Sequence, residues 1–190
     1  MPLSERYDQA LLFASQLHRS QLRKTTQVPY LSHLLAVSSL VLEHGGDEDE
    51  AIAALLHDAV EDQGGLPTLD EIRRRFGERV ADIVRGCSDS FTQPKPPWSE
   101  RKAAYLEHLR GAPPSVRLVA VADKLHNARS VLSDYLSIGE ALWGRFNSGR
   151  DQQLWYYRAL VDTFLAAGPG ALARELERVV AELEQLVQRR

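Results

Sequence analysis

The sequence predicts an all-α protein, and three observations support this prediction. Apolar residues recur every three or four positions in almost every segment, which is the spacing of one face of an α-helix. Glycines and prolines fall between these segments, where helices are expected to end. The composition, with 44% hydrophobic and 26% charged residues, is that of a folded globular protein. We therefore expect residues 1–190 to form one helical domain with its own core.

Two helices are expected in the first quarter of the chain. Their apolar positions have helical spacing: Tyr7, Ala10, Leu11, Ala14 and Leu17 in the first, and Leu31, Leu34, Leu35, Val37, Ser38 and Val41 in the second. The glycine pair at 45–46 can end the second helix. Asp47 is then placed to cap a third helix, which contains the apolar run 51–56 and continues to a glycine pair at 64–65.

Capping residues divide the middle of the chain. The segment Thr68 to Glu71 matches a capping box, which predicts a short helix that begins there and ends near Phe76. After Gly77, apolar residues at helical spacing predict another helix through Val84.

Prolines mark the next two boundaries. Three prolines within residues 88–97 cannot sustain a helix, so this stretch is expected to form an extended loop. Ser99 is then placed to cap one helix, and Ser115, which follows a proline pair, is placed to cap the next. The second of these helices contains a polar segment at residues 123–127.

Two further helices complete the expected fold. A polar stretch at 144–149 precedes a helix from Asp151 to about Ala167, and a Gly-Pro-Gly turn at 168–170 precedes the last helix. The last helix has an apolar stripe formed by Leu172, Leu176, Val179, Val180, Leu183 and Val187. We expect this stripe to pack into the core, and the alternative is a homodimer interface.

A polar doublet, His57 and Asp58, interrupts the apolar third helix. A buried helix gains nothing from groups that lose their hydration unless they bind something. His33 and Asp123, on two other expected helices, complete a set of two imidazoles and two carboxylates. Such a set suits manganese, iron or zinc better than calcium. The alternatives are a core histidine at position 33 and an aspartate at 123 that pairs with Lys124.

Two more carboxylates, Glu61 and Asp62, follow one helical turn after the doublet. A carboxylate in this position can accept a proton from water or orient the water for attack. The helix dipole disfavours acidic side chains at a helix C-terminus. Two of them there indicate that another interaction offsets this unfavourable energy. We therefore predict catalytic roles for both, against the alternative of a solvated helix end.

Basic residues stand near the predicted ligands in the sequence. They are His18, Arg19, Arg23 and Lys24 before the first ligand, and Lys124, His126 and Arg129 around the last. Because phosphate recognition uses such groups, we expect a small, phosphorylated, anionic substrate. The sequence has no Walker-type phosphate loop, no Gly-x-Ser-x-Gly elbow and no paired Cys-x-x-Cys motif, which leaves metal-assisted hydrolysis.

Charge and targeting signals limit the partners and the location. The formal net charge of −3 argues against DNA or RNA as a partner. Cys87 is the single cysteine, so the chain has no internal disulfide and fits a reducing compartment. No secretory signal and no bilayer-spanning apolar run are evident, so we expect no membrane association and a cytoplasmic location.

Three segments together resemble the HD-superfamily hydrolases of the Rel/Spo type. The segments are Arg23-Lys24 before Pro29-Tyr30-Leu31-Ser32-His33, then His57-Asp58-Ala59-Val60-Glu61-Asp62, and then Ala122-Asp123-Lys124-Leu125-His126-Asn127-Ala128-Arg129. With no synthetase domain attached, the chain is similar to a stand-alone small alarmone hydrolase. The resemblance covers about residues 7–130. It implies an HD-type helical bundle with a motif-bearing core at about 5–137 and C-terminal helices at about 151–188 packed on it.

The resemblance also implies an activity, which is manganese-dependent removal of pyrophosphate from the 3′ position of a guanosine or adenosine alarmone. It implies the following roles: His33, His57, Asp58 and Asp123 as metal ligands, Glu61 and Asp62 as groups that activate or position water, and Arg23, Lys24 and Asn127 as substrate contacts. Two other functions stay open: a hydrolase of another nucleotide or dinucleotide phosphate, and a non-catalytic alarmone sensor.

Arg150 is a further candidate for substrate binding. It lies in a stretch, residues 143–157, whose aromatic and cationic side chains are able to stack on a nucleotide base. The alternative for this stretch is packing within the C-terminal core.

Overall fold

The computed structural model describes residues 2–24, 26–90 and 96–189. It confirms the all-α prediction. The elements are α1 (Glu5–Leu17), α2 (Leu31–Glu43), α3 (Glu48–Leu56), α4 (Ala59–Asp62), α5 (Leu66–Phe76), α6 (Glu78–Cys87), α7 (Trp98–Gly111), α8 (Pro114–Ile138), the 3-10 helix η1 (Gly139–Arg145), α9 (Gly149–Ala167) and α10 (Ala171–Gln188). Within the described ranges, the β structure is limited to an isolated bridge between Leu22 and Pro29.

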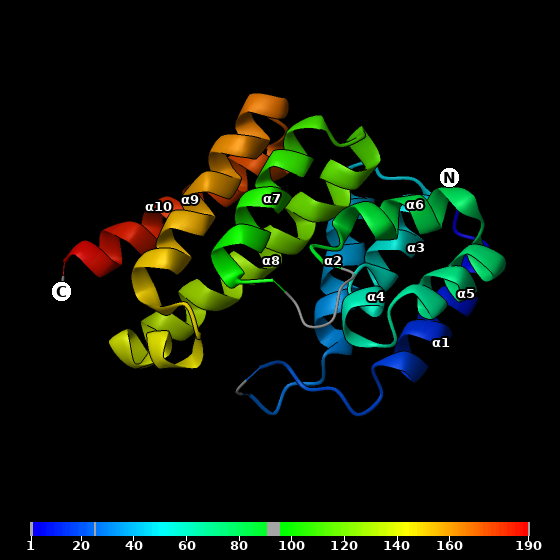
Figure 1. Cartoon of the computed structure of the whole chain (residues 1–190), viewed down its shortest axis with the longest axis horizontal. Coiled ribbons are helices and arrows are strands. Elements are labelled where there is room, and N and C mark those ends of the chain that lie inside the picture. Colours follow the sequence, from blue (N-terminus) through cyan, green and yellow to red (C-terminus); the bar gives the residue numbers. More distant parts are fainter. Residues whose placement is uncertain (1, 25, 91–95, 190) are drawn as a thin grey trace.

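Helix α8 connects the two ends of the molecule (Figure 1). On one side it contacts α2, α3 and α6, and on the other side it contacts η1, α9 and α10. The N-terminus and the C-terminus consequently lie at opposite ends of the long axis (Figure 1). Residues on α8 therefore face both groups of helices, and a site beside this helix can draw side chains from both.

Helix α3 lies in the middle of the core. Residues 51–56, its apolar run, are completely buried, and they pack with α1, α2, α6 and α8. Asp47 begins the helix with a capping box, in which its carboxylate accepts from the Glu50 amide at 3.0 Å and the Glu50 carboxylate accepts from the Asp47 amide at 2.8 Å. The sequence prediction for this helix start is confirmed.

The predicted continuation of this helix beyond residue 56 is wrong. Helix α3 ends at Leu56, His57 and Asp58 form a turn, and the short helix α4 follows. The His57 side chain takes part in this break, because its Nδ1 hydrogen-bonds the Ala54 carbonyl at 2.8 Å. The doublet therefore stands at the end of a buried helix rather than in the middle of one.

Three helix starts differ from the predictions made from serine and threonine caps. Helices α5, α7 and α8 begin before Thr68, Ser99 and Ser115, respectively. In α5 and α8 a proline lies in the first turn, where its fixed φ is suited to the helix and its missing N–H is not needed. Thr68 donates its hydroxyl to the Gln63 carbonyl at 2.6 Å.

The C-terminal helices follow the prediction, with α9 beginning two residues early at Gly149. The stripe of α10 packs on α8 and α9, and Leu172, Leu176, Val180 and Leu183 are buried there. The predicted loop at 88–97 includes residues 91–95, which lie outside the described residues. Among the described helices, none combines the length and apolar character that crossing a membrane requires.

Candidate active site

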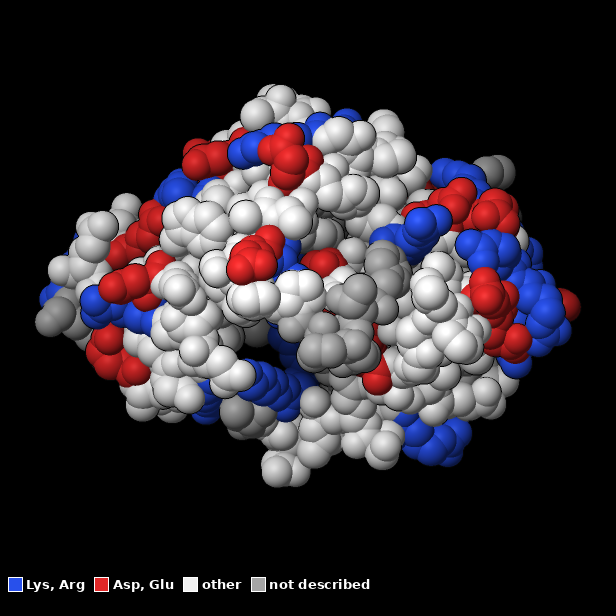
Figure 2. Space-filling model, in the orientation of Figure 1, with Lys and Arg blue, Asp and Glu red and all other residues white. Residues whose placement is uncertain are grey.

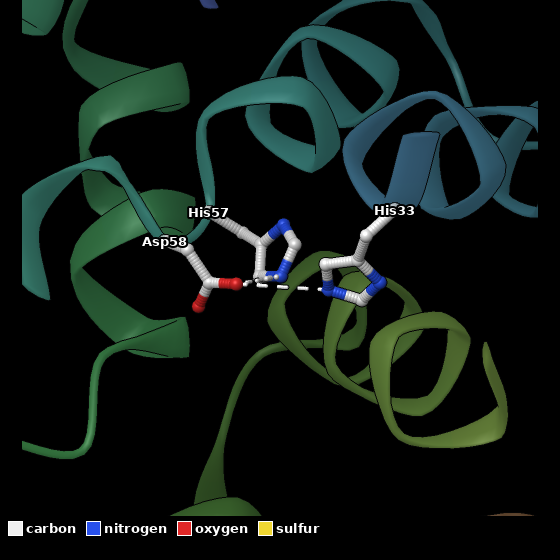
Figure 3. A group of neighbouring side chains, drawn as sticks. All are labelled: His33, His57 and Asp58. Carbon is white, nitrogen blue, oxygen red and sulfur yellow. Dashed lines mark ion pairs between the residues drawn. The ribbon is translucent and has the colours of Figure 1, made fainter. Parts of the chain in front are cut away.

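Four polar side chains from three parts of the fold converge beside the end of α3. His33 comes from the first turn of α2, His57 and Asp58 come from the turn between α3 and α4, and Asp123 comes from α8. Figure 3 shows the two imidazoles and the Asp58 carboxylate pointing toward one another. The four residues that the sequence singled out as ligands are thus neighbours in space.

The distances among these groups are those of a small polar centre. Asp58 Oδ2 lies 3.0 Å from His57 Nε2 and 3.6 Å from His33 Nε2. Asp123 Oδ1 lies 3.2 Å from His33 Nε2 and 3.6 Å from His57 Nε2. His33, His57 and Asp58 each offer a ligand atom within 4.8 Å of the others. Two carboxylate oxygens therefore face the same pair of ring nitrogens.

The two ring nitrogens that face the carboxylates are suited to bind a cation. Both Nε2 atoms are buried and lack a hydrogen-bond partner. The opposite nitrogen of each ring is engaged, with His57 Nδ1 on the Ala54 carbonyl and His33 Nδ1 on His126 Nδ1 at 2.8 Å. Since a carbonyl only accepts, His57 carries a proton on Nδ1, so Nε2 is the ring nitrogen that faces the carboxylates and is placed to bind a cation. The residues present fit a divalent metal ion with nitrogen and oxygen ligands.

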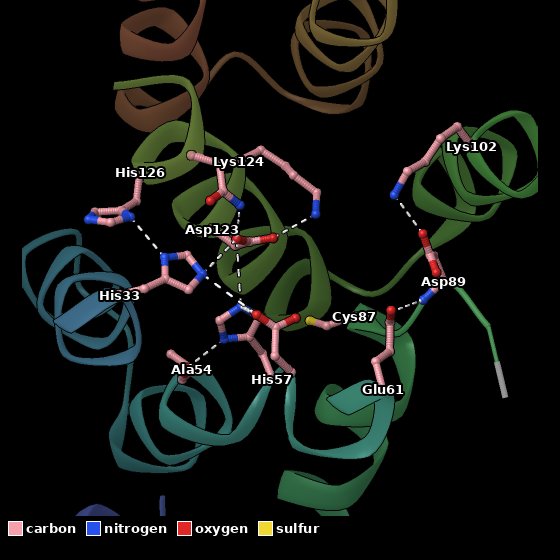
Figure 4. Close-up of polar contacts among 12 residues, drawn as sticks. His33, Ala54, His57, Glu61, Cys87, Asp89, Lys102, Asp123, Lys124 and His126 are labelled. Atoms are coloured by element: carbon pink, nitrogen blue, oxygen red, sulfur yellow. Dashed lines mark hydrogen bonds and ion pairs between the residues drawn. The ribbon is translucent and has the colours of Figure 1, made fainter. Parts of the chain in front are cut away.

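Asp123 is ionised despite its burial. Burial alone would raise the pKa of this carboxyl, but Lys124 and the two imidazoles hold it well below its ordinary value. Lys124 Nζ donates to Oδ2 at 2.6 Å (Figure 4). The Asn127 amide donates to Oδ1 at 2.6 Å. The ion pair with Lys124 that was the alternative for Asp123 is present, and it leaves Oδ1 directed at the imidazoles.

His126 hydrogen-bonds the ring nitrogen of His33 that points away from the carboxylates. Burial, together with nearby His33 and Arg23, lowers the pKa of His126 to about 4, so its ring is neutral at neutral pH. A neutral His126 is able to accept the Nδ1 proton of His33, which holds the ring with Nε2 facing the carboxylates. Such a partner fixes the tautomer and the ring orientation of a ligand.

We expect His126→Ala to weaken metal binding by about 10- to 100-fold, because the His33 ring loses the group that fixes its tautomer. The measurement is a titration of the metal-free protein with manganese. His126→Asn is the matched control, since its side-chain oxygen still offers an acceptor, and it should retain more of the affinity. Unchanged affinity in His126→Ala would contradict a supporting role for this ring.

Glu61 and Asp62 lie on α4, directly after the doublet, and are held by different partners. Glu61 accepts a hydrogen bond from the Asp89 amide at 2.6 Å, and Asp89 in turn pairs with Lys102 (Figure 4). Asp62 is exposed and accepts from the Gln21 side-chain amide at 2.7 Å. The two predicted water-handling carboxylates therefore have different hydrogen-bond partners and different exposure.

A cavity of about 670 Å³ lies beside His126 and Asn127, which hydrogen-bond the predicted ligands His33 and Asp123. Arg23, Lys24 and Asn127, the predicted substrate contacts, all line it, as do Arg129 and Arg145. Arg23 Nη2 donates to the Asn127 side-chain oxygen at 3.0 Å, so two of these contacts touch each other. Figure 2 shows the hollow, with Lys and Arg side chains on its wall. The cavity is suited to a small anion.

Arg150 does not line this cavity. Its guanidinium lies 2.9 Å from Asp151 and 3.6 Å from Glu140, and it borders a separate hollow around residues 140–152. The structure thus leaves a substrate role for Arg150 without a geometric basis.

Two contacts of the site were missed by sequence reasoning. The Tyr30 hydroxyl donates to Asp58 Oδ2 at 2.5 Å, and Gln21 reaches Asp62 from the segment between α1 and α2. A signal for Tyr30 was present, because it precedes His33 by three residues and thus shares its face of the helix. Gln21 offered no such signal, since its position depends on how residues 18–30 fold.

Residues 10–136 match the model of the HD domain family. The chain belongs to the HD domain family. This HD domain is similar to the guanosine-3′,5′-bis(diphosphate) 3′-pyrophosphohydrolase MESH1 of Xenopus tropicalis, with 40% identity over 65% of this chain and 68% of that protein. The enzyme of the same name from Homo sapiens is 38% identical over 63% of this chain and 65% of its own length. A pyrophosphohydrolase of Aquifex aeolicus is 36% identical over 67% of this chain but only 18% of that protein.

Solved structures extend the similarity of this HD domain beyond the motifs. One, described as a metazoan ortholog of SpoT that hydrolyzes ppGpp, superposes with a TM-score of 0.79 at 26% identity and covers 96% of this chain and 98% of that chain. A Listeria monocytogenes protein superposes with a TM-score of 0.71 at 33% identity, over 80% of this chain and 99% of its own. The first similarity therefore includes the C-terminal helices as well as the HD motifs.

Proposed function

We propose that the protein is a manganese-dependent pyrophosphohydrolase that removes the 3′-diphosphate from guanosine or adenosine alarmones. One observation carries this proposal: two buried imidazole nitrogens face two carboxylates at 3.0 and 3.2 Å, and a basic cavity lies beside the residues that hydrogen-bond this cluster. The relatives named for the same reaction on guanosine 3′,5′-bis(diphosphate) support the choice of substrate.

His33, His57, Asp58 and Asp123 would hold the metal ion. When bound there, a divalent cation supplies positive charge that offsets the negative charge developing on the phosphoryl oxygens. Manganese fits the mixed nitrogen and oxygen ligands and the absence of a thiolate among these four residues.

The basic wall of the cavity binds and orients the substrate. Arg23 and Lys24 offer hydrogen-bond donors to phosphate or base, and Asn127 links Arg23 to Asp123. Because Asn127 donates to Asp123 and accepts from Arg23, a nucleotide that contacts Arg23 is placed next to the ligand cluster. Because the bound substrate is already oriented, less entropy is lost when it reaches the transition state.

Glu61 and Asp62 handle the attacking water. The water oxygen bonds to the phosphorus nearer the ribose, the bond from this phosphorus to the ribose 3′ oxygen breaks, and the diphosphate leaves as pyrophosphate. One carboxylate takes the proton that the water gives up, and the 3′ oxygen gains a proton. We assign the proton transfer to Glu61, whose carboxylate is half-buried, and the orientation of water to the exposed Asp62.

A side-by-side substrate test with added manganese examines the proposal. Pyrophosphate release from guanosine and adenosine 3′,5′-bis(diphosphates) should exceed phosphate release from nucleoside monophosphates by orders of magnitude. A flat profile across nucleotides would reject the alarmone assignment in favour of a broader nucleotide phosphohydrolase. Tight alarmone binding without pyrophosphate release would instead indicate a sensor.

A further inference from the structure

A polar cluster outside the ligand set lies at the C-terminal end of α4. It consists of His18 at the end of α1, Gln21 in the segment between α1 and α2, and Gln63 at the end of α4. Figure 1 shows this connecting segment at the edge of the molecule. We call these three residues the glutamine relay. None of them belongs to the predicted ligands or catalytic groups.

The hydrogen bonds of the glutamine relay fix the orientation of the Gln21 amide. The Asp62 carboxylate can only accept, so the nitrogen of Gln21 must face it, at 2.7 Å from Oδ2. The Gln21 side-chain oxygen then faces the Gln63 amide nitrogen at 2.5 Å and His18 Nδ1 at 2.7 Å. If the Gln21 amide were flipped, its oxygen would face the Asp62 carboxylate, which is also an acceptor. Its nitrogen would face the Gln63 amide nitrogen, which is also a donor.

The same reasoning sets the proton on His18. Because Gln21 Oε1 accepts, His18 Nδ1 must donate, which leaves Nε2 without a proton. His18 is 2% exposed, and this burial lowers the pKa of the ring, which favours the neutral form. His18 also stacks on Tyr30 with ring centroids 5.3 Å apart, and Tyr30 donates to Asp58. The relay thus hydrogen-bonds Asp62 directly and contacts Tyr30, which hydrogen-bonds Asp58.

We propose that the glutamine relay is a positioning device that holds the Asp62 carboxylate in one orientation for turnover. Two donors, on His18 and Gln63, compel Gln21 to present its own donor to Asp62. The device deepens the proposed function, on which its catalytic consequence rests. Gln21 and Gln63 act through Asp62 and do not themselves touch the reacting atoms.

The test is a double-mutant cycle between Gln63→Glu and Asp62→Asn. Gln63→Glu replaces the donor with an acceptor of almost the same shape, so Gln21 can no longer satisfy both neighbours. We expect kcat to fall about tenfold, because Asp62 loses one charge-assisted hydrogen bond, while KM and manganese content stay unchanged. In the Asp62→Asn background the same change should cost less than about twofold, because coupled residues are not additive.

Two controls separate the relay from general effects. Gln27→Glu adds the same charge on an exposed position of the same connecting segment and should leave kcat unchanged. A nitrogen NMR spectrum of the resting protein reports the His18 tautomer independently of activity, and we expect the proton on Nδ1.

Several results would overturn the proposal. A wild-type kcat in Gln63→Glu, or an equal loss in both backgrounds of the cycle, would show that the relay does not act through Asp62. A His18 ring protonated on Nε2 would overturn the relay without affecting the proposed function. Wild-type turnover of Asp62→Asn would instead overturn the role of Asp62 in the proposed function.

Discussion

Asp58→Ala is expected to release the bound metal and to lower pyrophosphate release by about three orders of magnitude. Asp58 Oδ2 lies closest to His57 Nε2, and its charge is needed because Lys124 already offsets that of Asp123. Loss of the cation removes several kcal/mol of stabilisation from the transition state, and each 1.36 kcal/mol is a factor of ten in rate. Metal analysis after gel filtration and a pyrophosphate assay measure the two effects.

Asp70→Ala is the matched control for this substitution. Asp70 is an exposed aspartate on α5 that pairs with Arg73 and is none of the predicted ligands, catalytic groups or substrate contacts. This variant should retain both manganese and activity. If Asp58→Ala kept manganese at the wild-type ratio, Asp58 would not be a ligand.

Glu61→Gln is expected to keep the metal and to lose turnover. The glutamine oxygen can still accept from the Asp89 amide, so the local structure is preserved, but an amide cannot take a proton from water. Removal of a general base lowers kcat by about 10²- to 10⁴-fold. The measurement is kcat at saturating alarmone together with manganese content.

Glu107→Gln, an exposed glutamate on α7, makes the same chemical change away from the site and should leave kcat unaltered. Wild-type turnover in Glu61→Gln would move the proton transfer to another group. A parallel loss of manganese would assign Glu61 to the ligands instead.

The positions of helices were predictable from the sequence because apolar spacing reflects which face is buried. The capping box at Asp47 was equally local and was confirmed. The starts of α5, α7 and α8 were not predictable from serine and threonine caps, because prolines occupy or precede their first turns. The break at His57 was hidden because the apolar run gives no sign of a side chain that bonds the backbone of the preceding turn.

The convergence of the four polar residues was also predictable, since burying imidazole and carboxylate groups is costly without a partner. The structure brings them together, and their role as ligands stays a proposal. The path of the backbone through residues 18–30 could not be predicted from the sequence. This segment decides that Gln21 meets Asp62, that Tyr30 meets Asp58 and that Arg23 meets Asn127, and each contact spans at least 28 positions of the chain.

A metal ion bound by the four proposed ligands would also link metal supply to the lifetime of the folded protein. These ligands come from α2, from the turn after α3 and from α8, so the unfolded chain does not hold them together. An ion that binds only the native state stabilises it by about 2.7 kcal/mol when present at 100 times its dissociation constant. A cell that runs short of this metal would therefore lose the enzyme itself, through unfolding and proteolysis, as well as its activity.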